Sequence, residues 1–90
     1  MGNWLYTLDV MEIKRLGKER SITPKEWANK LAQAIKNQLP VLCEHDSELD
    51  QIVFDLEYDV DENASWDDTD EILETLYDWA DYNRCWVKSF

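Results

Sequence analysis

The sequence predicts a small α+β domain, in which about four helices form a bundle and strands from the two ends of the chain pair in a small sheet. Three observations favour this fold. Apolar residues recur at helical spacing through the middle of the chain, aromatic and branched residues gather at both ends, and only two glycines and two prolines interrupt the 90 residues. A chain of this length supports one hydrophobic core, so we expect residues 1–90 to form a single domain.

The terminal strands are expected in WLYTLDV near the start and in RCWVKSF at the end. Two short strands are marginal in water, so they should pair with each other on a helical layer. Alternation along the first strand, predicted from Trp4 to Leu8, places Trp4, Tyr6 and Leu8 on the buried face. Leu5 and Thr7 then lie on the opposite face. Parallel and antiparallel pairing fit the pattern equally well.

Two helices are predicted in the first half of the chain. Asp9 can cap a short helix with Glu12 as its reciprocal partner, and Gly17 is placed to end it. The second helix begins after Thr23, which is followed by a proline at the first helical position. The apolar residues at helical spacing end at residues 39–40, where we expect this helix to end.

Two further helices are predicted in the second half. The third begins near residues 46–47 and carries an apolar stripe that reaches Val60. The fourth is capped by Ser65, with Asp68 as the reciprocal partner, and runs to about Tyr82. Its buried side is expected to contain Thr69, Ile72, Leu73, Leu76 and Ala80.

The net charge of −11 is concentrated in one part of the chain, because residues 41–81 carry sixteen acidic side chains and no basic one. Such a surface repels nucleic acid and attracts basic protein surfaces. We therefore expect the partner to be the basic surface of a nucleic-acid-binding protein or complex, with no direct contact to nucleic acid.

Five carboxylates of the fourth helix share one face, opposite its apolar side. They form the acidic row: Asp67, Glu71, Glu74, Asp78 and Asp81. At about 100° and 1.5 Å per residue, they fall within an arc of about 80° over about 20 Å. Such a row imitates the charge of a phosphate backbone without presenting bases. The alternative is an acidic face that only keeps the protein solvated.

Two aromatic residues of the third helix, Phe54 and Tyr58, lie one turn apart and away from its apolar stripe. Exposed aromatic side chains are typical of interface hot spots. The alternative is that both rings support the terminal strands or another helix. Together with the acidic row, they complete the predicted partner-binding residues.

The segment DVDENASWDDTD, residues 59–70, contains the less favoured metal alternative. The oxygen ligands of a calcium loop would be Asp59, Asp61, Asn63, Asp67 and Asp70. However, Ala64 replaces the glycine that makes the sharp turn in such loops, and the last ligand is shorter than the usual glutamate. We therefore favour no metal site and expect no cofactor.

The two cysteines, Cys43 and Cys85, are far apart in sequence and outside any CxxC motif. Free thiols in a reducing cytosol are the favoured interpretation, with a disulfide as the alternative. Cys43 and His45 lack the second pair of ligands that zinc requires. We expect a cytoplasmic protein without a membrane partner, because no basic region precedes an apolar run and no segment approaches about 18 apolar residues.

Motifs for catalysis are missing from the sequence. It contains no nucleophile elbow and no glycine-rich phosphate loop, and no serine or cysteine has a histidine partner visible in sequence. Carboxylate pairs are so frequent that no single pair indicates acid–base catalysis. We therefore expect that the protein is not an enzyme.

Two terminal segments, NWLYTLDV and LYDWADYNRCWVKSF, carry a similarity to known sequences. They resemble the ends of a group of small uncharacterised proteins carried by phages, plasmids and bacterial chromosomes. The group ends with a YDWAD, R, W, K pattern, which residues 77–88 match. The resemblance implies a mobile-element context and supplies neither an activity nor site residues.

The expected function is that of a mobile-element inhibitor that mimics nucleic-acid charge and blocks a host DNA- or RNA-binding protein. In type and charge it is similar to phage-encoded anti-restriction and anti-CRISPR proteins, an analogy without a motif. One alternative is a small adaptor that binds a partner protein through exposed aromatics and the terminal strands. A calcium-binding helix-loop-helix module is the less favoured alternative. The sequence does not predict an oligomeric state.

Overall fold

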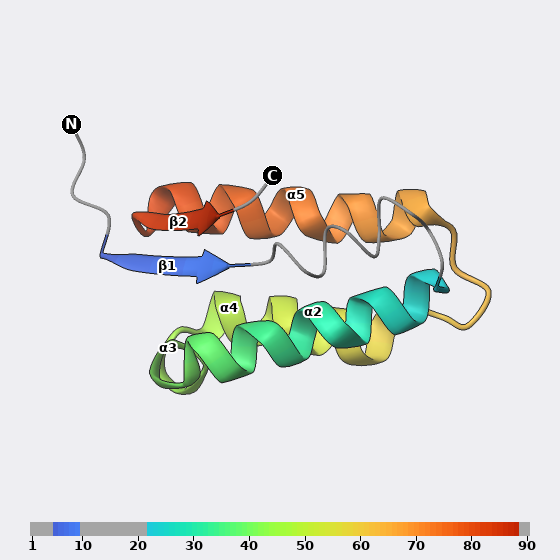
Figure 1. Cartoon of the computed structure of the whole chain (residues 1–90), viewed down its shortest axis with the longest axis horizontal. Coiled ribbons are helices and arrows are strands. Elements are labelled where there is room, and N and C mark those ends of the chain that lie inside the picture. Colours follow the sequence, from blue (N-terminus) through green and yellow to red (C-terminus); the bar gives the residue numbers. More distant parts are fainter. Residues whose placement is uncertain (1–4, 10–21, 89–90) are drawn as a thin grey trace.

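The computed structural model describes residues 5–9 and 22–88. The elements in order are β1 (Tyr6–Asp9), α2 (Pro24–Gln38), α3 (Pro40–His45), α4 (Ser47–Phe54), η1 (Asp55–Asp59), α5 (Trp66–Tyr82) and β2 (Cys85–Lys88). Element η1 is a short π-helix that continues α4. Within the described residues, four α-helices and a two-stranded sheet confirm the predicted α+β fold (Figure 1). The short helix expected at residues 9–17 lies outside them, apart from Asp9.

The two strands pair in parallel, which settles the direction that the sequence left open. Tyr6 is opposite Cys85 and Leu8 is opposite Val87 in the register. Leu8 is buried as predicted, but Tyr6 is 39% exposed, so the predicted inward face is wrong at this position. Tyr6 begins β1 at one end of the molecule, where the helices cover less of the strand (Figure 1). Trp4 lies outside the described residues.

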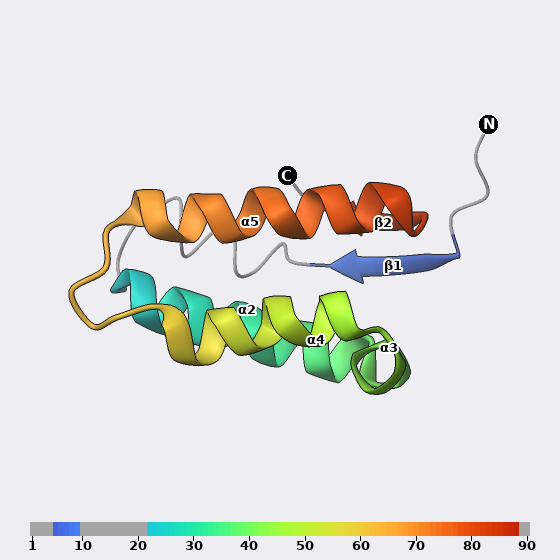
Figure 2. The same cartoon turned by 180° about the vertical axis from the view of Figure 1, so that it is seen from behind.

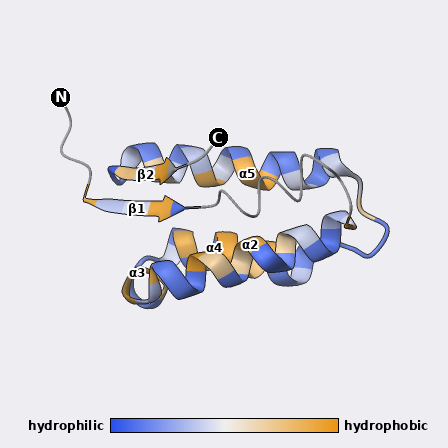
Figure 3. Ribbon diagram, viewed as in Figure 1, coloured by the Kyte–Doolittle hydropathy of each residue, from blue (hydrophilic) through white to orange (hydrophobic). Residues whose placement is uncertain are grey.

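The core lies between two groups of elements. Helix α5 and the sheet form one side, and α2 and α4 run next to each other on the other side (Figure 1, Figure 2). Figure 3 shows that these helices turn apolar residues inward and hydrophilic residues outward. The largest apolar side chains that are fully buried include Leu8, Leu31, Ile35, Leu49, Leu56 and Leu76.

Helix α2 begins as the sequence predicts. The Thr23 hydroxyl accepts a hydrogen bond from the Glu26 backbone N–H at 3.1 Å, and Pro24 is the first helical residue. At the other end, the helix closes at Leu39, which is its C-cap, as the sequence predicts. Pro40 then begins the six-residue helix α3, which was not predicted. Proline has no backbone N–H, and the first turn of a helix does not need one, so proline is well suited to this position.

The third predicted helix is divided into α4 and η1. Asp46 caps α4, and its Oδ1 atom accepts from the N–H groups of Glu48 and Leu49, both at 3.0 Å. The π-helical turn of η1 is contacted by Lys25 of α2, whose Nζ donates to the carbonyls of Glu57 at 3.3 Å and Val60 at 3.0 Å. Contacts from another helix therefore satisfy carbonyl groups that a helix end leaves unpaired.

Candidate functional site

Helix α5 carries the acidic row, and hydrogen bonds define where this helix begins and ends. The Ser65 N–H donates to the Asp68 carboxylate at 3.0 Å, so Asp68 stabilises the start of the helix. Past the other end, Arg84 has φ 55°, in the left-handed region that favours glycine. Its N–H donates to the carbonyl of Asp81 at 3.3 Å, and its carbonyl accepts from Leu5 at 2.9 Å. The turn at Arg84 thus connects the end of α5 to the sheet.

All five members of the acidic row are exposed, as predicted. The opposite face of α5 buries Thr69, Leu76, Trp79 and Ala80, while Ile72 and Leu73 are partly buried. One helix therefore presents a carboxylate in nearly every turn on one side and anchors itself in the core with the other.

Two cations of α2, Lys25 and Lys36, contact η1 and the residue that follows it. Lys36 forms an ion pair with Glu57, and the hydrogen bond to this carboxylate raises the pKa of Lys36. Lys25 contacts backbone carbonyls around η1. Among residues 5–9 and 22–88, no ion pair involves the acidic row. The negative charge of the row is thus uncompensated within this part of the chain.

Helix α5 is held to the rest of the fold at both ends. Near its start, Trp66 packs edge-on against Trp27 of α2, with ring centroids 6.1 Å apart. Near its end, the Trp79 indole N–H donates to Oδ2 of Asp46 at 3.0 Å. Asp46 therefore caps α4 with one oxygen and binds α5 with the other, which fixes the spacing of the two helices.

Phe54 and Tyr58 form an exposed aromatic pair. Their ring centroids are 4.9 Å apart, and the two residues are 50% and 67% exposed. This exposure favours the interface interpretation over support for the strands or another helix. Neither residue lines the two pockets described next, so the pair and the acidic row form separate features of the surface.

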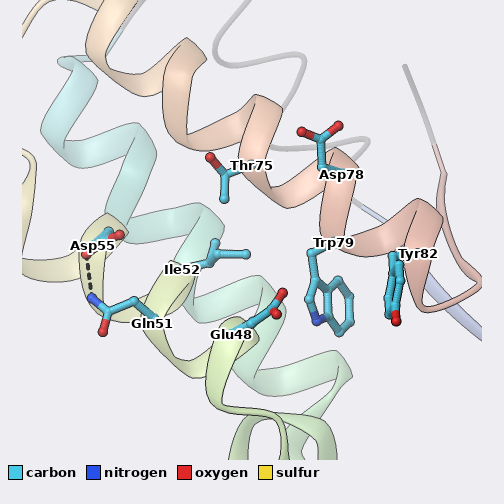
Figure 4. A pocket seen from close by; sticks show the side chains of 8 residues that line it. All are labelled: Glu48, Gln51, Ile52, Asp55, Thr75, Asp78, Trp79 and Tyr82. Carbon is cyan, nitrogen blue, oxygen red and sulfur yellow. Dashed lines mark hydrogen bonds between the residues drawn. The ribbon is translucent and has the colours of Figure 1, made fainter.

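An open pocket of about 550 Å³ lies between α4 and α5 (Figure 4). We call it the α4–α5 pocket; its lining residues are Glu48, Gln51, Ile52, Asp55, Thr75, Asp78, Trp79 and Tyr82. Only Asp78 among them was predicted as a site residue. The sequence does contain a signal for this pocket, in residues 48, 51, 52 and 55. They share one face of a helix and include two acidic residues and one apolar residue, but they were not predicted as a site.

A smaller pocket of about 310 Å³ lies between α5 and β2, lined by Tyr77, Ala80, Asp81, Cys85, Trp86 and Val87. Burial raises the pKa of Tyr77 to about 12, so its hydroxyl stays protonated at neutral pH. Two members of the acidic row line these pockets, Asp78 the first and Asp81 the second. The pockets therefore adjoin the C-terminal end of the row.

The five residues of the calcium alternative are all exposed and are distributed over different elements. Asp59 ends η1, Asn63 lies in a turn, and Asp67 and Asp70 belong to α5. A hydrogen bond between the carboxyl groups of Asp59 and Asp55 raises the pKa of Asp59. In the described ranges, no group of three or more Asp, Glu, His or Cys residues could hold a metal ion.

Both cysteines are free thiols, as the favoured interpretation expects, while the reducing cytosol stays a prediction. Cys85 is buried in β2, and burial raises its pKa, as partial burial does for Cys43. A raised thiol pKa means less thiolate at neutral pH and lower reactivity. No helix in the described ranges is long and apolar enough to span a membrane.

The chain matches no protein-family model, and comparisons with curated proteins and with solved structures give no match. The resemblance of its ends to phage and plasmid proteins therefore stays an expectation. The structure places the second similar segment at the end of α5, the turn at Arg84 and β2.

Proposed function

We propose that this protein is a non-enzymatic inhibitor that binds the basic surface of a nucleic-acid-binding protein or complex and blocks it by mimicking nucleic-acid charge. The observation that carries the proposal is the acidic row: five exposed carboxylates on one face of a 17-residue helix. No described residue forms an ion pair with them.

The spacing of the row suits a surface that binds phosphates. With a rise of about 1.5 Å per residue, the five carboxylates repeat about every 5 Å along the axis. A DNA strand places one charge about every 3.4 Å, which is of the same order. A groove of arginines and lysines that reads phosphates would therefore contact several carboxylates at once, and the row offers no base edges.

The anchoring of α5 supports this role. The helix is packed at its start through Trp66 and hydrogen-bonded near its end through Trp79. A charged array on an ordered helix loses less conformational entropy on binding than a flexible one, so more of the electrostatic attraction contributes to affinity. A flexible acidic tail of equal charge would bind more weakly.

A mobile-element context would make the partner part of a host defence, as in anti-restriction or anti-CRISPR inhibition. Such an inhibitor acts in the cytoplasm of the host cell, where restriction and CRISPR complexes bind nucleic acid. This part of the proposal depends on the resemblance of the two chain ends.

Charge reversal tests the proposal. Wild-type protein and the variant with Glu71→Lys, Glu74→Lys and Asp78→Lys are used to capture partners from a bacterial lysate at about 0.05 M and about 0.5 M salt. We expect a nucleic-acid-binding partner to be retained by the wild type at low salt only. Wild-type protein should then displace labelled DNA or RNA from the purified partner, and the variant should not.

A matched control changes the charge equally at exposed carboxylates outside the row, with Glu26→Lys, Glu44→Lys and Glu62→Lys. This control should keep most of the inhibition, because its row is intact. Equal loss of inhibition in both variants would mean that the net charge of the protein determines inhibition and the position of the charges does not. If reversal of the row leaves partner binding unchanged, charge mimicry is wrong.

The adaptor alternative is favoured by one observation, the exposed pair of Phe54 and Tyr58. An aromatic pair with this exposure is a candidate hot spot. Under this alternative, Phe54→Ala together with Tyr58→Ala abolishes partner binding, and binding is insensitive to salt and to reversal of the acidic row.

A further inference from the structure

We propose that the α4–α5 pocket accepts an arginine side chain from the basic surface of the partner. The inference rests on the proposed function and deepens it, because it identifies the partner residue that would anchor the complex. It comes from three features of the pocket: an apolar floor, a carboxylate rim and an exposed aromatic ring.

The floor of the pocket is apolar and preformed. Ile52 and Trp79 are both buried in the fold and line the space from opposite helices. The Trp79 ring is fixed by its hydrogen bond to Asp46. The methylene groups of a long basic side chain can pack on such a floor while the charged head stays near water.

The rim is negatively charged on both helices. Glu48 and Asp55 lie on the side formed by α4 and η1, and Asp78 lies on α5. Among the described residues that line the pocket there is no lysine, arginine or histidine. In Figure 4, Glu48 extends toward Trp79, whereas Asp78 points away from α4 and continues the acidic row. Figure 4 also shows that Glu48 lies beside Trp79, whereas Asp55 lies further along, beyond Gln51. A cation beside Trp79 would therefore meet Glu48 first, and Asp55 adds negative charge to the other end of the pocket.

Asp55 adds a reason for a cation to bind. Its carboxylate accepts from the Gln51 side chain at 2.8 Å and is hydrogen-bonded to Asp59. The hydrogen bond to Asp55 raises the pKa of Asp59, and the negative charge of Asp55 adds to this shift. A carboxylate has about four lone-pair sites, which leaves Asp55 able to accept from a further donor. A bound cation would relieve the repulsion between the two acids.

Tyr82 favours arginine over lysine. It is the last residue of α5, it is 86% exposed, and in Figure 4 its ring lies next to Trp79 on the same side of the helix. A planar guanidinium can stack on an aromatic ring and donate two parallel hydrogen bonds to a carboxylate, whereas an ammonium cannot do both. The pocket volume of about 550 Å³ is also large enough for this side chain with part of its backbone.

The test uses short synthetic peptides in which glycine alternates with arginine, lysine or neutral citrulline. Binding to the 90-residue protein is followed by NMR, using the indole N–H of Trp79 and the backbone N–H of Tyr82. We expect the arginine peptide to shift both signals and to bind more tightly than the lysine peptide. The citrulline peptide should not bind. Shifts confined to residues outside the pocket would overturn the inference.

Two matched variants separate the pocket from the general charge. Glu48→Gln with Asp55→Asn removes two charges from the pocket, and Glu71→Gln with Glu74→Gln removes two from the row outside it. The pocket variant should bind the arginine peptide about fivefold more weakly, the size expected for two exposed ion pairs. The row variant should change binding by less than about twofold because it leaves the pocket rim intact. Equal weakening in both variants would contradict a specific pocket.

Tyr82→Leu keeps an apolar side chain and removes the ring, so it tests the preference for arginine. We expect this variant to lose part of the preference for the arginine peptide over the lysine peptide, because the carboxylates can still bind a guanidinium through two hydrogen bonds. A preference that is unchanged from the wild type would rule out stacking on Tyr82. Thermal melting of every variant checks that the fold is retained.

The pocket and the proposed function can fail separately. If the peptide does not bind in the pocket but reversal of the row abolishes partner binding, charge mimicry stands and the pocket inference fails. If the peptide binds in the pocket but no nucleic-acid-binding partner is inhibited, the proposed function fails and the arginine pocket stands.

Discussion

The carboxylates around α4 and η1 differ from those of the acidic row in what they contact. Asp46 caps α4 and binds the Trp79 indole, and Glu57 pairs with Lys36 of α2. The row has no ion-pair partner among the described residues. Similar residues in one acidic segment therefore divide into those that stabilise the fold and those that remain available to a partner. Three changes test this division.

The largest expected effect comes from Asp46→Ala. It removes the cap of α4, which is worth about 1 kcal/mol. It also leaves the buried Trp79 N–H without its acceptor, at a cost of about 1–3 kcal/mol. We expect the free energy of unfolding, measured by urea denaturation, to fall by about 2–3 kcal/mol.

The control for this change is Asp46→Asn, which keeps a capping oxygen and should lose less stability. If Asp46→Ala costs no more than a typical surface substitution of about 0.5 kcal/mol, the link between α4 and α5 is not stabilising.

A smaller effect of opposite sign is expected from neutralising the row with Glu71→Gln, Glu74→Gln and Asp78→Asn. Like charges three or four residues apart destabilise a helix by about 0.2–0.5 kcal/mol per pair, so the variant should be about 1 kcal/mol more stable at low salt. The gain should shrink as salt is added, because screening already weakens the repulsion in the wild type. Denaturation at two salt concentrations measures both effects, and a destabilised variant would mean that the row also supports the fold.

The smallest effect concerns the pH dependence of Asp59. Its pKa is raised in the folded state by the hydrogen bond to Asp55, so the protonated form is favoured on folding. The stabilisation is fully present below the unfolded pKa of 3.8 and is lost as the pH rises through the higher folded pKa. A carboxyl NMR titration should give Asp59 a pKa above 3.8, and Asp55→Ala should lower it. An unchanged value in that variant would show that Asp55 is not the cause.

Local signals in the sequence were sufficient for most of the fold. The cap at Thr23, the reciprocal pair of Ser65 and Asp68, and the apolar side of α5 were all predicted, because each depends on residues only a few positions apart. Terminal strands that pair with each other were also predicted. Their parallel direction was not, because it depends on how the whole chain returns across the helices.

The site was predicted less completely than the fold. Helical spacing alone places the acidic row on an exposed face, but the α4–α5 pocket requires two helices at a defined separation. That separation depends on Trp79 reaching Asp46 across 33 positions of sequence. The π-helical turn of η1 was not predicted either. Lys25 contacts it from another helix, and a local sequence pattern does not show such a contact.

The parallel pairing of β1 and β2 also constrains how the chain folds. Tyr6 and Cys85 are opposite each other although 79 positions separate them. Closing such a long loop is entropically costly, and contacts of this kind slow folding. During synthesis, β1 emerges from the ribosome first and has no strand partner until β2 has been made. We therefore expect the helices to assemble first, with the pairing of β1 and β2 as a late step.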